Sequence, residues 1–303
     1  MKGRRILPGP CLARRTTMGL GGEALAEVRV SEARFLGQAF DEALRLAHDR
    51  GGRVVFLGRG SNLLVREGVL PLVLLSLDLR QDLTIRENGA GGSIRAGADT
   101  PLAAVLAAAA AHGFSGLEAL AGIPGSLGGA LVMNAGSYGT CMADVTQSAW
   151  IFTRDQGLRE VPAEDLAFAY RECRLKEKGR AALEDFLVTE VTVRLLRDDP
   201  ARIRERMAGF FSRKRSGQPV AARSAGCVFK NPHPEHPAGR LLEEAGLRGR
   251  QRGGMSFSPL HANFLINDGQ GAFDQAMELI AEAQEAVRRR SGFSLELEVR
   301  VWP

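Results

Sequence analysis

The chain has 303 residues, of which 45% are hydrophobic, so it is long enough for two domains with a sizeable core. No apolar run approaches the ~18 residues of a membrane-spanning helix, which excludes a helical membrane protein. The net charge of +5 does not indicate nucleic-acid binding, because five basic residues precede the first acidic residue, Glu23, and the remaining chain is balanced.

Cysteine usage and the N-terminal residues indicate the compartment. The four cysteines form no C-x-x-C pair, which argues against a zinc site or a redox motif and fits a reducing compartment. No apolar signal-peptide core follows the basic N-terminal residues. We therefore expect a cytoplasmic monomer with no metal site and with neither nucleic acid nor membrane as a partner.

The first two-thirds of the chain predicts a strand-rich α+β region. Helical spacing of apolar residues predicts helices over residues 31–50, with Ser31 as N-cap, and 102–112, after Thr100-Pro101. Apolar or alternating runs predict strands at residues 53–57, 63–65, 149–153, 158–161 and 186–196. The turn Asp155-Gln156-Gly157 favours a hairpin between two of these strands.

A domain boundary is predicted just before Asp199-Pro200, which gives domains of residues 1–197 and 198–303. The helix that begins there carries Arg202, Arg204 and Arg206, which we expect mainly on its solvated face. A second helix is predicted over 272–291. Alternation in residues 295–302 predicts a final strand with Glu296, Glu298 and Arg300 on one face.

The most informative segment is residues 116–139, which contains seven glycines among apolar residues. Glycines at this density let the backbone approach a ligand and expose N–H groups that can hold a diphosphate. We expect a buried, ordered loop, with a purely structural turn as the alternative. A second glycine-rich loop, residues 58–62, follows the strand at 53–57 and matches neither a Rossmann nor a Walker pattern. Two such loops suit a long dinucleotide such as FAD.

The chain resembles the UDP-N-acetylenolpyruvoylglucosamine reductase family, the flavoenzymes of the peptidoglycan precursor pathway. Seven blocks occur in the family's order from residue 15 to residue 300, including Gly58-Arg-Gly-Ser-Asn62, Gly122-Ile-Pro-Gly125 and Lys230-Asn231-Pro232. The short distance from Arg171 to Cys227 resembles the shorter class, which lacks an extra substrate-capping loop. The resemblance implies a two-part FAD-binding domain of the PCMH type, followed by a smaller α+β substrate-binding domain.

The resemblance also implies the reaction. Electrons pass from NADPH through FAD to the methylene carbon of UDP-N-acetylglucosamine enolpyruvate, which yields UDP-N-acetylmuramate. The chemistry needs a cation for the carboxylate charge and an acid for the neighbouring carbon. Arg171, Cys227 and Glu298 match the catalytic positions, although Cys227 stands where the best-known members have a proton-donating Ser, and Cys173 also replaces a Ser.

Further site residues follow from the matching blocks. Those expected to bind the cofactor are Gly58, Gly60, Ser61, Asn62, Leu63, Gly122, Ile123, Gly125, Ser126, Gly128, Gly129, Asn134, Gly136 and Arg300. Those expected to bind the substrate are Tyr170, Arg213, Lys230, Asn231, His261 and Asn263. For His261 and Asn263, packing is an equal alternative. Another flavin oxidoreductase of the same cradle fold and a nucleotide-binding module without chemistry stay open as rival functions.

Overall fold

The computed structural model describes residues 3–79, 83–178 and 186–303, and its packing divides the chain into two compact units. Unit 1 comprises Met1–Pro8, Ala26–Arg59 and Pro71–Arg213, and unit 2 comprises Gly9–Leu25, Gly60–Leu70 and Lys214–Pro303. Within the described ranges, no helix is both long enough and apolar enough to cross a bilayer.

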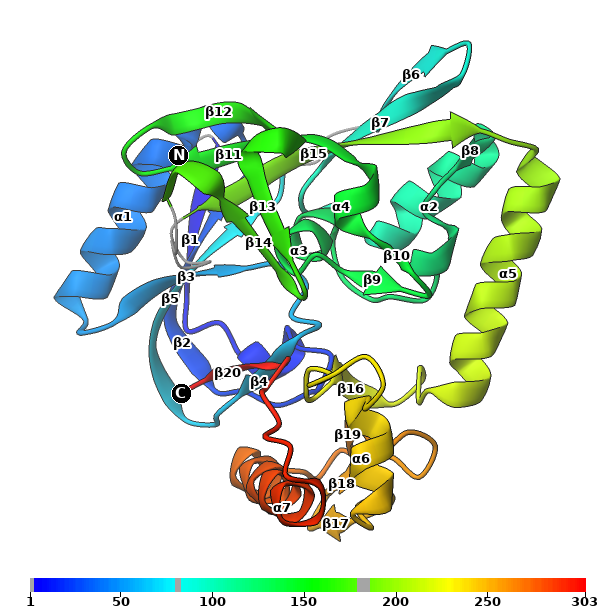
Figure 1. The fold of residues 1–303 in the computed structure, drawn as a ribbon. Helices are drawn as coiled ribbons and strands as arrows, with labels where there is room; N and C mark the ends of the chain where they lie inside the picture. The colour runs from blue at the N-terminus through cyan, green and yellow to red at the C-terminus, as the bar shows by residue number, and fades with distance from the viewer. Residues whose placement is uncertain (1–2, 80–82, 179–185) are drawn as a thin grey trace. The chain divides into compact units, whose positions relative to one another are not determined.

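Unit 1 contains a six-stranded sheet and most of a four-stranded sheet (Figure 1). One has the strand order β12-β11-β15-β7-β6, with β8 paired to β15, and the other has the order β1-β2-β5-β3. Their strands are β1 (Arg4–Pro8), β2 (Glu23–Val30), β3 (Arg53–Leu57), β5 (Val69–Leu77), β6 (Thr84–Asn88), β7 (Gly91–Gly97), β8 (Phe114–Ser115), β11 (Thr146–Thr153), β12 (Gly157–Pro162) and β15 (Leu187–Arg197). The central strand β15 buries the predicted apolar face, because Thr189, Val191 and Val193 are all fully buried.

Helices and short hairpins complete unit 1. Leu102, Val105 and Leu106 of α2 pack into the same apolar core as Val191 and Val193 of β15. The helices are α1 (Leu36–Asp49), α2 (Leu102–Ala111), α3 (Leu127–Val132), α4 (Met142–Val145) and α5 (Pro200–Gly217). The short strands are β9 (Gly136–Ser137), β10 (Thr140–Cys141), β13 (Leu166–Ala169) and β14 (Glu172–Leu175).

Unit 2 is a smaller α+β unit around the sheet β16-β19-β18-β17 (Figure 1). Its elements are β4 (Leu63–Val65), β16 (Arg223–Cys227), α6 (Ala238–Glu244), β17 (Gln251–Arg252), β18 (Met255–Phe257), β19 (Phe264–Asn267), α7 (Phe273–Ser291) and β20 (Arg300–Trp302). One buried face of α7, with Phe273, Leu279 and Val287, joins the core of this unit. Strands β20 and β4 pair in parallel.

The packing division differs from the predicted boundary at residue 197/198. Most of α5 belongs to unit 1, where Arg206 contacts Glu118 and Asp198. Unit 2 also includes two early segments, residues 9–25 and 60–70, because hydrogen bonds join them to its C-terminal part. The Thr17 hydroxyl donates to the Ser224 carbonyl at 2.6 Å, and strand β4 pairs with the last strand of the chain.

Most predicted elements are confirmed, and three details are wrong. Ser31 does not cap a helix, because Glu32 is the N-cap of the short 3-10 helix Ala33–Phe35 and α1 begins only at Leu36. The final strand covers only Arg300–Trp302, since residues 296–298 run irregularly beside Val228–Lys230. The segment expected as a loop between residues 116 and 139 contains the helix α3 and the paired strands β9 and β10.

Candidate active site

The two glycine-rich segments meet within unit 1 at Ser126. A Cβ atom added to Gly58 would lie 3.2 Å from the Ser126 Oγ, and one added to Gly129 would lie 3.3 Å from it. This oxygen also accepts the Gly129 N–H, so that Ser126 caps α3. The missing side chains at Gly58 and Gly129, both exposed, leave open backbone on either side of the buried hydroxyl.

The backbone around the start of α3 is fixed by bonds to the segment that leads into α2. The Gly128 N–H donates to the Ala98 carbonyl at 2.9 Å, and Leu102 N–H donates to the Gly125 carbonyl at 3.1 Å. Gly125 has a φ of +126°, which favours glycine. Within the described part of the chain, the N–H groups of Gly125 and Ser126 donate no hydrogen bond. A pair of adjacent donors beside a hydroxyl and an open backbone fits the diphosphate of a dinucleotide.

The remaining residues of the first glycine-rich loop lie in unit 2. Gly60 has a φ of +63°, and a Cβ there would lie 2.0 Å from the Arg15 carbonyl oxygen, so no larger residue fits. The Asn62 amide donates to the Glu298 carbonyl at 3.1 Å, and the Arg300 N–H donates to the Asn62 carbonyl at 3.0 Å.

Four predicted site residues from opposite ends of the chain are therefore adjacent in unit 2: Asn62, Leu63, Glu298 and Arg300. The Leu63 side chain is buried in this arrangement. Ser61, which precedes them, is half-buried.

Arg171 occupies a strained position in unit 1. It follows Tyr170 in the two-residue turn between β13 and β14, and its φ is +61°. The left-handed region costs a non-glycine residue about 1–2 kcal/mol, and such strain tends to persist at functional sites. The guanidinium donates to the Gly136 carbonyl at 3.2 Å and lies 5.2 Å from the Tyr170 ring. The Gly136 carbonyl thus orients the Arg171 side chain, and both residues are predicted site residues.

Asn134 holds this turn rather than facing outward. Its amide nitrogen donates to the Ala169 carbonyl at 3.0 Å, immediately before Tyr170, and its amide oxygen accepts the Ala143 N–H at 3.0 Å. Asn134 is 8% exposed and has a φ of +39°. In the described ranges, the non-glycine residues with a positive φ are Asn134, Tyr138 and Arg171. All three lie in segments that the sequence predicted to form the site.

Arg213, near the end of α5, packs on aromatic rings of unit 1. Its guanidinium lies 4.9 Å from the ring centroid of Tyr138 and 4.7 Å from that of Phe210. Tyr138 is 47% exposed and Phe210 is half-buried, so this cation stands on a partly exposed aromatic surface.

The two cysteines of interest differ in environment. Cys227, the last residue of β16, is partly exposed and follows Gly226, which has a φ of +83°. A register shift between Ser224 and Cys227 interrupts the pairing with β19 and changes the direction of the strand there. Cys173 is fully buried in unit 1, and burial raises the pKa of its thiol to about 12. Of these two, only Cys227 is accessible to a substrate.

The other predicted residues of unit 2 divide into exposed and structural groups. Lys230 and Asn231 are partly or fully exposed, with Lys230 Nζ 3.4 Å from Glu296 and the Asn231 oxygen accepting the Ala238 N–H. Asn263 is 2% exposed, and its amide bonds both the N–H and the carbonyl of Phe229. Burial lowers the pKa of His261, whose Nδ1 accepts the Asn263 N–H at 3.2 Å.

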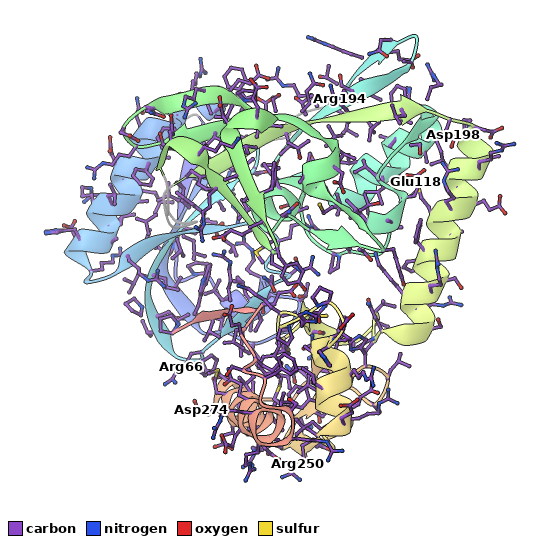
Figure 2. All side chains as sticks on the ribbon, viewed as in Figure 1. Arg66, Glu118, Arg194, Asp198, Arg250 and Asp274 are labelled. Atoms are coloured by element: carbon purple, nitrogen blue, oxygen red, sulfur yellow. The ribbon has the colours of Figure 1, made fainter. Side chains whose placement is uncertain are left out.

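Sequence reasoning missed a buried carboxylate at the start of the glycine-rich segment. Glu118 accepts the Gly116 N–H at 2.7 Å and binds Arg206 at 2.7 Å, while Arg206 also binds Asp198 at 2.6 Å. Figure 2 labels the two carboxylate residues, Glu118 and Asp198. Arg202 and Arg204 are exposed as expected, and Arg206, whose side chain is 40% exposed, uses its guanidinium for these two ion pairs. No sequence signal pairs Arg206 with Glu118, because the two residues are 88 positions apart and the local helix pattern does not record such a contact.

Lys214 was also missed, as one member of a basic cluster. It is 3% exposed, and burial lowers the pKa of its ammonium group to about 8.

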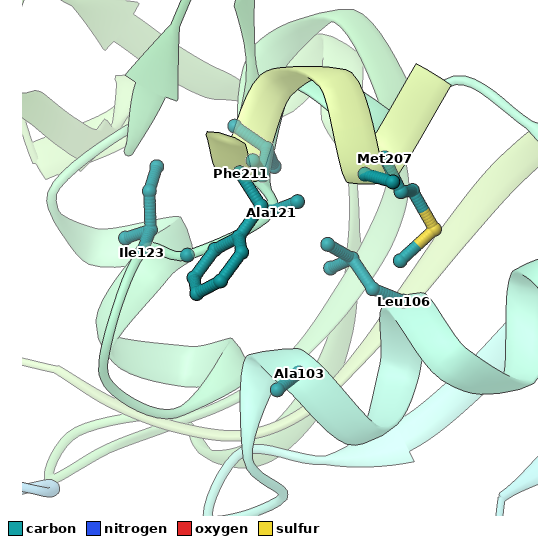
Figure 3. A pocket seen from close by; sticks show the side chains of 9 residues that line it. Ala103, Leu106, Ala121, Ile123, Met207 and Phe211 are labelled. Carbon is teal, nitrogen blue, oxygen red and sulfur yellow. The ribbon is translucent and has the colours of Figure 1, made fainter. Parts of the chain in front are cut away.

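An apolar cavity of about 280 Å³ lies in unit 1 between α2, α5 and the glycine-rich segment (Figure 3). Leu106, Ile123, Met207 and Phe211 point into it. Its lining consists of Ala103, Leu106, Leu120, Ala121, Gly122, Ile123, Met207, Ala208 and Phe211. These side chains offer no hydrogen-bonding groups, so the cavity does not suit a diphosphate or a carboxylate.

Comparison with known proteins agrees with this arrangement. Residues 38–160 match a FAD binding domain, and residues 218–302 match the C-terminal domain of UDP-N-acetylenolpyruvoylglucosamine reductase. The fold and the site thus define an α+β flavoprotein oxidoreductase with a FAD-binding part of the PCMH type. The chain belongs to the UDP-N-acetylenolpyruvoylglucosamine reductase family.

Individual relatives cover nearly the whole chain. The UDP-N-acetylenolpyruvoylglucosamine reductase of Nitratidesulfovibrio vulgaris is 48% identical over 98% of both chains, and that of Oleidesulfovibrio alaskensis is 45% identical over 98% of both. The crystal structure of the enzyme (MurB) from Thermus caldophilus matches 99% of this chain and 100% of its own, with a TM-score of 0.79 and 33% identity.

Proposed function

We propose that this chain reduces UDP-N-acetylglucosamine enolpyruvate to UDP-N-acetylmuramate with NADPH, in peptidoglycan precursor synthesis. The observation that carries the proposal concerns the strained turn that presents Arg171. The Asn134 amide bonds the backbone just before this turn, and the Gly136 carbonyl accepts the Arg171 guanidinium. Family membership supplies the substrate and NADPH. We further propose a cytoplasmic location and a monomeric state.

In unit 1, the backbone of Gly58, Gly125 and Ser126 and the Ser126 hydroxyl would hold FAD. When bound, it supplies the hydride, taken from NADPH, that reduces the methylene carbon of the substrate. Asn134 is reassigned from a cofactor ligand to a positioning residue, since both ends of its amide are used by backbone groups.

Side chains of this chain stabilise the negative charge on the substrate and donate the proton. Arg171 stabilises the negative charge that develops on the substrate carboxylate, and Glu298 helps to polarise that carboxyl group. The Cys227 thiol donates a proton to the carbon beside the carboxylate, and the resulting thiolate regains a proton from solvent. Lys230 and Asn231 bind the substrate, whereas Asn263 and His261 hold the segment before β19 in place.

Anaerobic half-reactions test the proposal. NADPH should bleach the flavin, and the enolpyruvyl substrate should then restore its colour. Arg171→Ala and Glu298→Gln should bleach at near-native rates yet reoxidise at least ~10²-fold more slowly, the lower range for loss of one charge-stabilising group. The matched control is Arg174→Ala, from the same hairpin, because the ion pair that Arg174 makes among the described residues is with its near neighbour Glu172.

Two results would contradict the proposal at different levels. Bleaching without any substrate-dependent reoxidation of the native enzyme would leave a flavin oxidoreductase with another substrate. Native-like reoxidation of Arg171→Ala would remove Arg171 from its role while leaving the reaction intact.

A further inference from the structure

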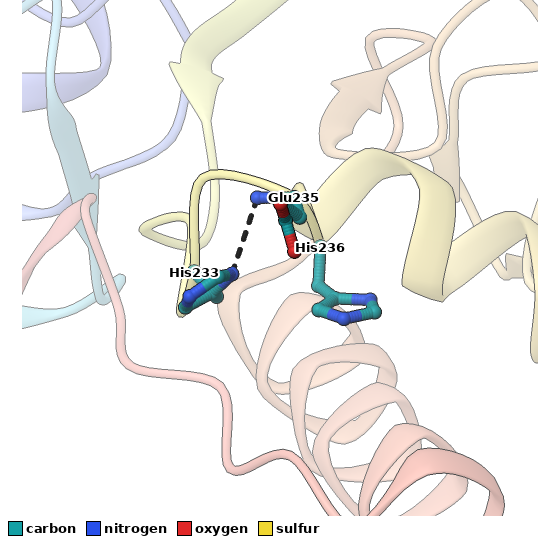
Figure 4. Close-up of side chains that lie close together, drawn as sticks. All are labelled: His233, Glu235 and His236. Atoms are coloured by element: carbon teal, nitrogen blue, oxygen red, sulfur yellow. Dashed lines mark hydrogen bonds between the residues drawn. The ribbon is translucent and has the colours of Figure 1, made fainter.

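A turn in unit 2 brings two histidines and a carboxylate together outside the residues discussed above. The His–Glu turn comprises His233, Pro234, Glu235 and His236, and it lies between Asn231 and α6. One ring nitrogen from each histidine and a Glu235 carboxylate oxygen all lie within 4.8 Å of one another (Figure 4). All three side chains are exposed, so an ion from solvent can reach them.

The backbone of the His–Glu turn is already fixed. The His236 N–H donates to the His233 carbonyl at 3.1 Å, and Pro234 at the second position suits such a turn. The bond from Ala238 N–H to the Asn231 side chain at 3.0 Å closes the base of the loop. The His236 ring packs 4.9 Å from the Phe293 ring. Little backbone order therefore has to be gained when a ligand binds.

One of the donor atoms is described by its hydrogen bond. The Glu235 N–H donates to His233 Nδ1 at 3.2 Å, so this nitrogen is unprotonated and its lone pair is directed into the turn. A tetrahedral zinc site with bonds of about 2.0–2.1 Å places its ligand atoms about 3.3 Å apart. The three groups can reach that spacing by side-chain rotation, because they are exposed. The metal then replaces the hydrogen bond to His233.

We propose that the His–Glu turn is a binding site for a divalent transition metal of the zinc type, with three protein ligands and a water molecule in the fourth position. Imidazole nitrogen and carboxylate oxygen are ligands that Zn²⁺ accepts in this number. The bound ion would fasten the turn that leads into α6. The cysteine spacing gave no indication of this site, because it uses no cysteine, and the inference does not depend on the flavin reaction.

The test is titration of ZnCl₂ into the full-length, FAD-loaded protein after chelator treatment, followed by calorimetry. We expect one ion per chain and a rise in Tm, since a ligand that binds only the folded state stabilises it. His233→Gln, Glu235→Gln and His236→Gln should each weaken binding at least ~10-fold, about 1.4 kcal/mol. The control variant His112→Gln should bind normally, because His112 lies 3.6 Å from the carboxylate of Glu87 but is not part of the three-residue cluster found among the described residues.

Substitution of Co²⁺ for zinc identifies the ligand atoms. Absorption bands of a nitrogen and oxygen site without a thiolate charge-transfer band would support the proposal. Equal binding by the native protein and the three turn variants would overturn it, as would a thiolate band or no saturable binding.

Discussion

At the residue scale, two cysteines in the predicted site segments differ in their exposure to solvent. Cys227 is partly exposed at the end of a strand, whereas Cys173 is fully buried and its thiol has a pKa raised to about 12. A proton donor must reach the substrate and must carry a proton at neutral pH. Of these two thiols, Cys227 is the one that meets the first condition.

We therefore predict that Cys227→Ser keeps substantial activity and that Cys227→Ala loses at least ~10²-fold in substrate-driven flavin reoxidation, the lower range for a general acid. Stopped-flow absorbance after NADPH reduction measures this rate. Cys173→Ala serves as the control and should change stability more than rate. Near-native reoxidation of the Cys227→Ala variant would make Cys227 a packing residue.

Asn134 gives a second residue-scale prediction, because its amide fixes the turn that carries Arg171. Asn134→Gly accepts the positive φ but removes both side-chain bonds. We expect normal FAD content, normal bleaching by NADPH and reoxidation slowed ~10-fold or more, because a small misplacement of a charge-stabilising group is costly. A variant that loses FAD instead would restore Asn134 to the cofactor ligands.

At the element scale, the short helix α3 and its neighbours form a dense structure rather than an open loop. A Cβ on Gly128 would lie 2.5 Å from the Cβ of Ala98, although the same helix exposes Gly129. The glycines of this segment thus serve two purposes, close packing at Gly128 and open backbone at Gly129. The sequence pattern alone does not separate the two.

Gly128→Val should therefore destabilise the protein by about 1–3 kcal/mol or more, as overpacking does, and lower its FAD content. The ratio of flavin to protein absorbance and the Tm measure the two effects. Gly37→Val is the matched control, because a Cβ on Gly37 in α1 meets nothing within 4 Å. A Gly128→Val protein with full FAD content and native Tm would contradict the packing described for α3.

The contact of α5 with the glycine-rich segment leads to a pH-dependent prediction. Burial raises the pKa of Glu118, but the Gly116 N–H and the Arg206 guanidinium outweigh it and hold the pKa below 4.5. A lowered pKa means that the stabilisation is present above the unfolded-state value and is lost as pH falls through the folded-state value.

Glu118→Gln should accordingly lower the free energy of unfolding at pH 7 by about 1–3 kcal/mol. The difference from the native protein should shrink as pH falls below 4.5. Urea unfolding at several pH values measures it. The control is Glu205→Gln, an exposed position on α5, which should stay within ±0.5 kcal/mol. A deficit independent of pH would show that the charge of Glu118 does not matter.

At the scale of the whole molecule, the two units are not consecutive stretches of sequence. Unit 2 combines residues 9–25 and 60–70 with the C-terminal third, and β4 pairs with β20 from residues more than 230 positions apart. The Asn62 amide and the Arg300 N–H tie the same two segments together. The last residues of the chain are thereby placed beside one of the predicted cofactor segments.

The sequence by itself determined the elements whose signals are local. Periodicity predicted α7, α2 and the hairpin of β11 and β12, because burial of one face repeats with the period of the element. The ordered family blocks predicted the fold class, FAD and the family. The positive φ at Gly60 and Gly125 favours glycine, so the sequence itself also indicated these two positions.

Only the tertiary structure decided which residues are partners. The bonds of Asn134 to Ala169, of Asn62 to Glu298 and of Glu118 to Arg206 join positions 35 to 236 residues apart. No local pattern records such pairs, because a polar side chain looks the same in sequence whether it is solvated or buried. For the same reason the exposure of Cys227, the burial of Cys173 and the division into two units follow from how the chain packs.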